Sequence, residues 1–393
     1  MAFQEKRGFA LFLGAILFLT HCAHHPPPKE KVKTEFLLLG TSSPSGQAGN
    51  LQEALGKKKA IYDAIKQLSS TNNTVIIYDA SGSMRGNLAE GGPKKYEAAY
   101  EGLKQIGTLF QSSDTVRLFV FGSKKPSGIT SDGVVIRKDY IRAMEASGDV
   151  ELVYASSKEG FSQKEYLAAI KYLGSPAAYI GDTPIGYSVL KVHQIIKGTP
   201  KAKVILITDG EETGPLLAQS ISKDKAWEER LRKSYPNYDD LTISAFESIK
   251  KLIADTIHFS PILYGLKGST ADKLISDKEA KSIRDFYHKL ATESGSIYLE
   301  AVTPSELLNA FMDAELMSLP YGLYSLENDK RNQLVAKGKI GLSLTVEEGR
   351  YLLRTDTERP LELEVELRPS VKNVYSFDID PNGKLRVLRE GTQ

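Results

Sequence analysis

Two short apolar stretches, VIIYD at residues 75–79 and VILITD at residues 204–209, decide how this chain is expected to fold. Each is a run of aliphatic residues without polar alternation, and each ends on an aspartate. Such runs are typical of strands that are buried on both faces of a parallel sheet. Because ligands of open parallel sheets bind beyond the carboxyl ends of the strands, Asp79 and Asp209 are expected at one binding edge.

Segments of strand and helix character alternate through the middle of the chain, which predicts an α/β fold with a parallel central sheet flanked by helices. The expected strands are 74–79, 115–121, 203–209, 257–264 and 296–300. The expected helices are 51–68, 95–110, 163–173, 184–197, 241–255, 271–292 and 304–316.

Two stretches are longer than a minimal fold of this class requires, 122–181 and 215–240. The second is charged and aromatic and includes Trp227. Tryptophan, tyrosine and arginine are frequent in binding hot spots, so either stretch could form a surface for a partner. The alternative is an extra helix in which Trp227 is packed inward.

After Pro320 the sequence pattern changes. Short segments of alternating apolar and polar residues are separated by turns, and helical periodicity is absent. We expect a small antiparallel β domain at 335–393, or else a β extension packed on the main domain. The expected strands of this region are 338–345, 350–355, 361–367, 372–379 and 384–388. The whole predicted division is a signal peptide at 1–21, a linker at 22–50, a helical lead-in at 51–73, an α/β domain at 74–320 and the β domain.

Bulk composition leaves room for a large core and gives no reason to expect nucleic acid as a partner. The 393 residues are 41% hydrophobic and 25% charged, which are ordinary globular values. With 51 basic and 49 acidic residues the net charge is +2, too small to indicate a polyanionic partner. Cys22 is the only cysteine, so no intrachain disulfide is possible.

The amino terminus has the pattern of an export signal. Basic residues at 6–7 precede an apolar run of about a dozen residues, which is shorter than the ~20 that a membrane-spanning helix requires. Residues 19–22, Leu-Thr-His-Cys, resemble a bacterial lipobox, although His21 stands where that motif has a small residue. The resemblance implies lipidation of Cys22 and a location in the cell envelope, anchored to a membrane. The alternative is a plain signal peptide or signal anchor with an incidental cysteine.

A set of oxygen-bearing side chains gathers around the two aspartates. Asp79, Ser81 and Ser83 alternate after the first apolar strand, Thr183 follows in Gly-Asp-Thr-Pro, and Asp209 ends the other strand. Carboxylate, hydroxyl and water oxygens are the ligands that Mg²⁺ prefers, whereas zinc and copper favour sulfur or imidazole. The pattern therefore predicts a site for one hard divalent cation.

These motifs, in this order, resemble those of a von Willebrand factor type A (VWA) domain, and the resemblance covers about 74–316. All five positions of its metal-ion-dependent adhesion site (MIDAS) are present: Asp79, Ser81, Ser83, Thr183 and Asp209. The resemblance implies one Mg²⁺ or Mn²⁺ ion at these residues. It also implies a protein partner whose acidic side chain completes the coordination of the ion.

Three classes of function were weighed. The favoured class is an exported, lipid-anchored, metal-dependent protein-binding module. The alternative is a structural scaffold of the envelope in which the aspartates merely cap loops, Thr183 caps its helix and the metal site is non-essential. An enzyme is not expected, because the chain has no HExxH motif and Ser81 is not in a Gly-x-Ser-x-Gly turn.

Overall fold

The structure is a computed structural model, and it describes residues 29–38, 48–68, 72–88, 92–124, 148–181, 183–199, 202–210, 258–266, 280–281, 283–285, 287–288, 291, 296–316, 319–327, 331–369, 373–380, 382 and 384–390. The expected signal peptide, Cys22, the helix at 241–255 and Trp227 lie outside these residues. None of the described helices is long and apolar enough to cross a membrane.

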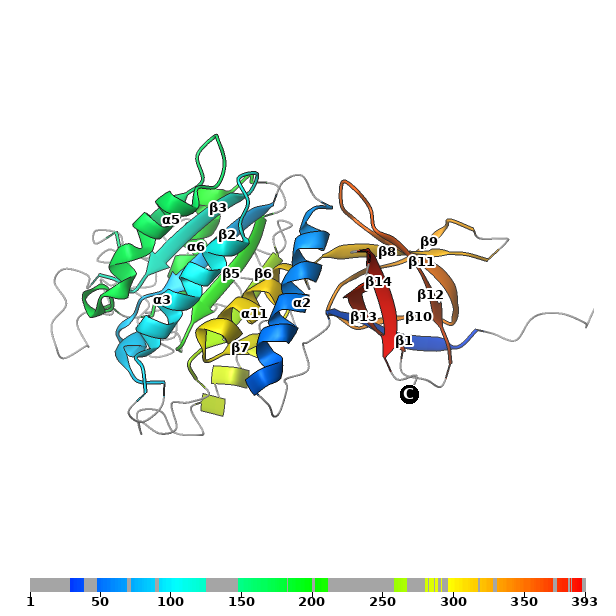
Figure 1. Cartoon of the computed structure of the whole chain (residues 1–393), viewed down its shortest axis with the longest axis horizontal. Helices are drawn as coiled ribbons and strands as arrows, with labels where there is room; N and C mark the ends of the chain where they lie inside the picture. Colours follow the sequence, from blue (N-terminus) through cyan, green and yellow to red (C-terminus); the bar gives the residue numbers. More distant parts are fainter. Residues whose placement is uncertain are drawn as a thin grey trace, which may run out of the picture.

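A six-stranded sheet forms the centre of the α/β unit, as the sequence predicts (Figure 1). Its strand order is β4-β3-β2-β5-β6-β7, and only β4 runs antiparallel to its neighbour. The strands are β2 (Asn73–Asp79), β3 (Thr115–Phe121), β4 (Glu151–Ala155), β5 (Ala202–Thr208), β6 (His258–Tyr264) and β7 (Leu299–Ala301). The edge strand β4 falls within the long 122–181 stretch, where we predicted no strand.

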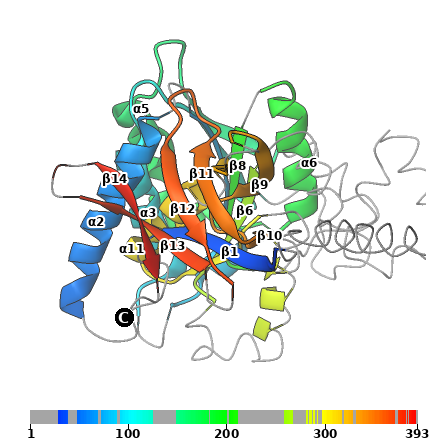
Figure 2. The ribbon, with the colours of Figure 1, turned by 90° about the vertical axis from the view of Figure 1, so that its right-hand side faces the viewer.

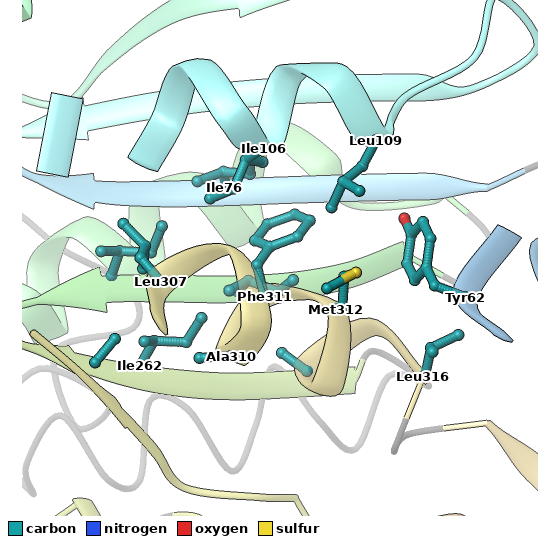
Figure 3. Close-up of a cluster of buried hydrophobic side chains, with 14 of the residues drawn as sticks. Tyr62, Ile76, Ile106, Leu109, Ile262, Leu307, Ala310, Phe311, Met312 and Leu316 are labelled. Atoms are coloured by element: carbon teal, nitrogen blue, oxygen red, sulfur yellow. The ribbon is translucent and has the colours of Figure 1, made fainter. Parts of the chain in front are cut away.

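Alternate residues of the central strands enter two separate cores on the two faces of the sheet. On β2, Ile76 lies in the core that helices α3 (Lys95–Ile106) and α11 (Pro304–Leu316) cover, whereas Val75 and Ile77 lie in the core that α6 (Ile185–Ile196) covers. Figure 3 shows Ile76 beside Ile106 of α3 and Phe311 of α11. This two-sided burial is the reason that the strand sequences are apolar without alternation.

The helices begin and end close to the expected residues. The described α-helices are α2 (Ala48–Lys66), α3 (Lys95–Ile106), α5 (Gln163–Ile170), α6 (Ile185–Ile196) and α11 (Pro304–Leu316). Short 3-10 turns are η1 (Gly82–Arg85), η2 (Gly107–Leu109), η3 (Lys171–Gly174) and η4 (Pro176–Ala178). Helix α2 lies between the α/β unit and the carboxyl-terminal strands (Figure 1).

A second unit, here called the β unit, consists of two four-stranded sheets with the orders β10-β1-β13-β14 and β12-β11-β8-β9. Figure 2 shows it in front of the α/β unit. Its carboxyl-terminal strands are β8 (Pro320–Ser325), β9 (Leu334–Lys339), β10 (Leu344–Glu347), β11 (Gly349–Thr355), β12 (Glu362–Leu367), β13 (Asn373–Ile379) and β14 (Leu385–Glu390). The unit therefore begins at Pro320, earlier than the expected 335.

The β unit also takes one strand from the amino-terminal region. Strand β1 (Lys31–Leu38) pairs antiparallel with β10 and parallel with β13, although these residues fall within the predicted linker. Phe36 is fully buried, stacks on Tyr375 and meets Tyr321 edge to face. The linker prediction is wrong for 31–38, because the pairing partners of this short segment lie more than 300 residues away.

Candidate metal centre

The carboxyl ends of β2 and β5 bring Asp79 and Asp209 together. The two strands are parallel neighbours in a register that pairs Tyr78 with Ile207, so both aspartates lie at one edge of the sheet. We call this edge, where the parallel strands end, the carboxyl-end edge. Both side chains are fully buried. Strand ends that were predicted to share an edge therefore do so.

Asp79 is held by the chain on both of its carboxylate oxygens. Oδ1 accepts a hydrogen bond from the backbone N–H of Ser81 at 2.8 Å, and Oδ2 accepts one from Oγ1 of Thr208 at 2.6 Å. Burial, together with the nearby charge of Asp209, raises the pKa of Asp79 to about 7, against the hydrogen bonds, which lower it. The position thus favours a bound positive charge.

The serine hydroxyls link the first motif to Asp209. Oγ of Ser81 and Oγ of Ser83 are 2.9 Å apart, and Ser83 donates to Oδ1 of Asp209 at 2.7 Å. Gly82 lies between the two serines, and its N–H donates to the carbonyl oxygen of Gly181 at 2.9 Å. Two hydroxyls and one carboxylate therefore form a continuous row of oxygens.

Thr183 reaches the same place from the loop before α6. Gly181, two residues earlier, forms a parallel bridge with Ser81. A Cβ atom at Gly210 would lie 3.7 Å from Oγ of Ser83 and 3.9 Å from Oγ1 of Thr183, so both hydroxyls flank the turn after Asp209. All five residues of the predicted set are thus brought to one edge.

The helix after Thr183 begins one residue later than the sequence predicts. Helix α6 begins at Ile185, and its N-cap residue is Pro184, which makes no side-chain cap hydrogen bond. The helix expected at 184–197 therefore starts one residue too early in the prediction.

The donor set fits a hard divalent cation by its chemistry. It offers two carboxylates and three hydroxyls, all oxygen, which suits Mg²⁺ or Mn²⁺ with some water retained. No group of three or more His, Cys, Asp or Glu side chains occurs among the residues that the structure describes. A cation here would therefore depend on the serine and threonine hydroxyls as well as on the aspartates.

Several residues at the edge were not singled out from the sequence. Lys95, the first residue of α3, is buried and places Nζ 2.9 Å from Oδ2 of Asp209. Thr208 donates a hydrogen bond to Asp79, as described above, and Tyr287 donates one to the carbonyl oxygen of Gly210 at 2.9 Å. A lysine that opens an amphipathic helix gives no sequence signal of burial, whereas Thr208 could have been found from its position beside Asp209.

Position 181 requires a glycine for a steric reason that the sequence motif alone does not reveal. A Cβ atom there would lie 2.7 Å from the carbonyl oxygens of Gly122 and Lys124. The Gly181 N–H also donates to the Gly122 carbonyl, and Asp149 in turn accepts from the N–H groups of Gly122 and Lys124. This close backbone approach fixes the loop that carries Thr183.

Comparison with known proteins gives structural likenesses at low sequence identity. No family model matches the sequence, and no curated protein matches it. The chain is similar to a von Willebrand factor type A protein from Catenulispora acidiphila, with 15% identity and a TM-score of 0.40, over 86% of this chain and 73% of that chain. An aerotolerance-related membrane protein from Bacteroides fragilis has 15% identity and a TM-score of 0.34, over 61% of this chain and 96% of that chain. A manganese-loaded TRAP protein from Plasmodium vivax has 11% identity and a TM-score of 0.34, over 78% and 94% respectively. The case for function rests on the residues of the site.

Proposed function

We propose that this chain is a protein-binding module that holds one Mg²⁺ or Mn²⁺ ion at the carboxyl-end edge of its α/β unit. The observation that supports this most is the row of oxygens from Ser81 and Ser83 to Asp209, to which Asp79 is joined by the backbone N–H of Ser81. Thr183 flanks the same turn from a third segment. These five side chains come from three distant parts of the sequence and meet at one edge of the sheet.

The residues of the chain would divide the work of binding. Ser81, Ser83 and Thr183 would offer neutral oxygens, and the two aspartates would offer charge and accept the existing hydrogen bonds. When bound, the ion would supply a directed positive charge to which an acidic side chain of a partner protein can coordinate. Specificity would then come from the loops around the edge.

A scaffold role is the second candidate, and one observation favours it. Lys95 already supplies a positive charge to Asp209, so part of the buried negative charge is compensated without any ion. In that case the edge would be a structural feature and the chain would bind its partners without metal.

Metal titration separates these two candidates. We expect Mn²⁺ to bind the purified protein in isothermal titration calorimetry with about one ion per chain, and Asp79→Asn to abolish this binding. Asp114→Asn is the control, because Asp114 is also a buried aspartate but lies at the opposite edge of the sheet, where it pairs with Lys66. Loss of binding in the control, or its survival in Asp79→Asn, would support the scaffold.

Partner binding is tested in the same variants. Under the proposal, immobilised protein captures a partner from envelope extract with Mg²⁺, and both EDTA and Asp79→Asn remove this capture. Capture that persists in EDTA would show that the metal is not needed, and would favour the scaffold.

We also propose that the chain is exported and anchored through a lipid on Cys22, in the cell envelope. The strand β1 that follows the amino-terminal region is built into the β unit, so an anchor at Cys22 would hold that unit nearest the membrane. Cys22→Ala is expected to move the protein from the membrane fraction to the soluble fraction after cell lysis. An unchanged membrane fraction would contradict the lipid anchor.

A further inference from the structure

Lys95 is a buried cation inside the candidate metal centre. Its side chain is 5% exposed, and its Nζ lies 2.9 Å from Oδ2 of the fully buried Asp209. The other oxygen of that carboxylate accepts the hydroxyl of Ser83. One aspartate of the site is therefore shared between the row of metal-type ligands and an ammonium group.

The position of Lys95 is unfavourable for the helix that carries it. Lys95 is the first residue of α3, where the positive end of the helix dipole disfavours a cation. Lys94 is the N-cap residue of this helix, and its N–H donates to the carboxylate of Glu97 at 3.1 Å. A buried ammonium is costly unless it is paired, so its tie to Asp209 is what accounts for its place.

Neighbouring backbone and side chains fix the stem of Lys95. Its N–H donates to the carbonyl oxygen of Gly86 at 2.9 Å. Gly265 follows β6 with a φ of +74°, and a Cβ there would meet the Lys95 stem and Leu88 at 3.1 Å. The backbone of Lys95 is therefore fixed at Gly86, its stem is packed beside Gly265, and its ammonium group is directed to Asp209.

The charges at this edge change the expected behaviour of a bound ion. Asp79 and Asp209 together would neutralise a divalent cation, but Lys95 already offsets one of them. An added ion therefore leaves one unit of positive charge in excess in a buried place, and an anionic ligand would remove that excess. Repulsion between buried like charges is weakly screened, so the effect on affinity is expected to be large.

We propose that Lys95 is a built-in counter-cation, which weakens divalent metal binding at Asp209 and makes retention of the metal depend on an anionic ligand. This inference rests on the proposed function and adds to it that metal and acidic partner bind cooperatively. In the absence of ligand, Lys95 keeps Asp209 paired. When a carboxylate of the ligand coordinates the ion, its negative charge offsets the excess positive charge that the ion and Lys95 otherwise leave in the site.

The test is calorimetry of Mn²⁺ binding to the full chain and to two variants of Lys95. Lys95→Met is expected to tighten Mn²⁺ binding at least tenfold, because it removes the competing charge. Lys95→Arg keeps the charge and is expected to bind like the wild type or more weakly. Lys57→Met is the matched control, because Lys57 pairs with a buried aspartate, Asp378, in the β unit and is expected to change nothing.

Acetate then serves as a probe for the acidic ligand. We expect acetate to tighten Mn²⁺ binding to the wild type severalfold, and to have less effect on Lys95→Met. If Lys95→Met binds Mn²⁺ no more tightly than the wild type, or if acetate acts equally on both, the inference is wrong. Should Lys95→Met fail to fold, Lys95→Arg and the acetate effect on the wild type still decide, because no acetate effect on the wild type contradicts the coupling.

Failure of this inference differs from failure of the proposed function. If the wild type binds Mn²⁺ and Asp79→Asn does not, but the Lys95 variants match the wild type, only the role of Lys95 is refuted. If neither the wild type nor any variant binds Mn²⁺, with or without acetate, the metal-binding function is itself refuted.

Discussion

The two edges of the six-stranded sheet both contain buried charges, but they compensate them differently. At the edge where the parallel strands begin, here the amino-end edge, Lys66 pairs with Asp114 at 2.6 Å, and Lys58 pairs with Asp313 at 2.6 Å on α2 and α11. At the carboxyl-end edge, Asp79 and Asp209 are both buried, and among the described residues Lys95 is the one lysine that pairs with them. The first edge is matched in charge, and the second has an excess of carboxylate.

Glu315 shows how closely the amino-end edge is matched. Burial opposes ionisation, but the charges of Lys203 and Lys66 and hydrogen bonds from Thr74 and Tyr62 hold the pKa of Glu315 below its usual value. At the other edge, burial and the charge of Asp209 raise the pKa of Asp79 instead. Burial also raises the pKa of Asp313 at the amino-end edge, although Lys58 opposes this. The comparison therefore rests on the pairing of charges: each buried carboxylate of the amino-end edge has a lysine near it, whereas the carboxyl-end edge is suited to a cation from outside.

Breaking a pair at the matched edge should give the largest effect on stability. Lys66→Met would leave Asp114 buried and uncompensated and would remove the hydrogen bond from Nζ to the carbonyl oxygen of Leu109. Loss of one partner of a buried pair costs about 3–5 kcal/mol, so the urea midpoint should fall strongly. Mn²⁺ affinity should be unchanged in calorimetry, and a change in affinity would show that the two edges are not independent.

The excess of carboxylate at the carboxyl-end edge should make the stability of the protein depend on pH. In EDTA, the folded chain keeps a proton on Asp79 up to about pH 7, whereas the unfolded chain loses it near 3.8. This contribution to stability is therefore complete below about pH 4 and is lost as the pH rises through 7, at up to about 1.4 kcal/mol per pH unit. Urea unfolding at pH 5 and pH 8 should show it, and Asp79→Asn should flatten this dependence.

Asp63→Asn is the control for this pH effect, because Asp63 is a partly exposed aspartate in a helical pair with Lys59. It should keep the pH dependence of the wild type. An equally steep dependence in Asp79→Asn would mean that another group is responsible. Saturating Mn²⁺ should also flatten the dependence in the wild type, because a bound cation favours the ionised aspartate.

Sequence reasoning found the strands and helices that local pattern determines. The strand at 115–121 and the helix at 304–316 occur with the predicted bounds. Burial on one or both faces gives consecutive residues a recognisable apolar pattern, so such elements can be predicted locally. The edge position of Asp79 and Asp209 followed from the same logic, since parallel strands place their carboxyl ends together. Element boundaries elsewhere moved by a few residues, as in α3, which ends at Ile106 and continues as a 3-10 turn.

What the sequence did not reveal depends on distant pairing. Strand β1 is defined by partners at the other end of the chain, and nothing local to 31–38 names them. Lys95 likewise became part of the site only because the start of α3 lies beside Asp209, the residue that follows β5. The spacing of apolar residues identifies which face of a helix is buried. It does not identify which charged residue of another segment will lie against that face.

Thr208→Val gives the smallest of the expected effects and the sharpest comparison between the edges. The substitution keeps the shape of the side chain and removes the hydroxyl that donates to Oδ2 of Asp79 at 2.6 Å. Supporting groups of this kind typically change metal affinity by about 10–100-fold, and loss of one buried hydrogen bond costs about 1–2 kcal/mol. Thr74→Val is the matched control, because Thr74 donates to the buried carboxylate of Glu315 at the amino-end edge of the same sheet. Both variants should lower the urea midpoint by a similar amount, but only Thr208→Val should weaken Mn²⁺ binding in calorimetry. Equal effects of the two variants on Mn²⁺ would contradict the assignment of the site to the carboxyl-end edge.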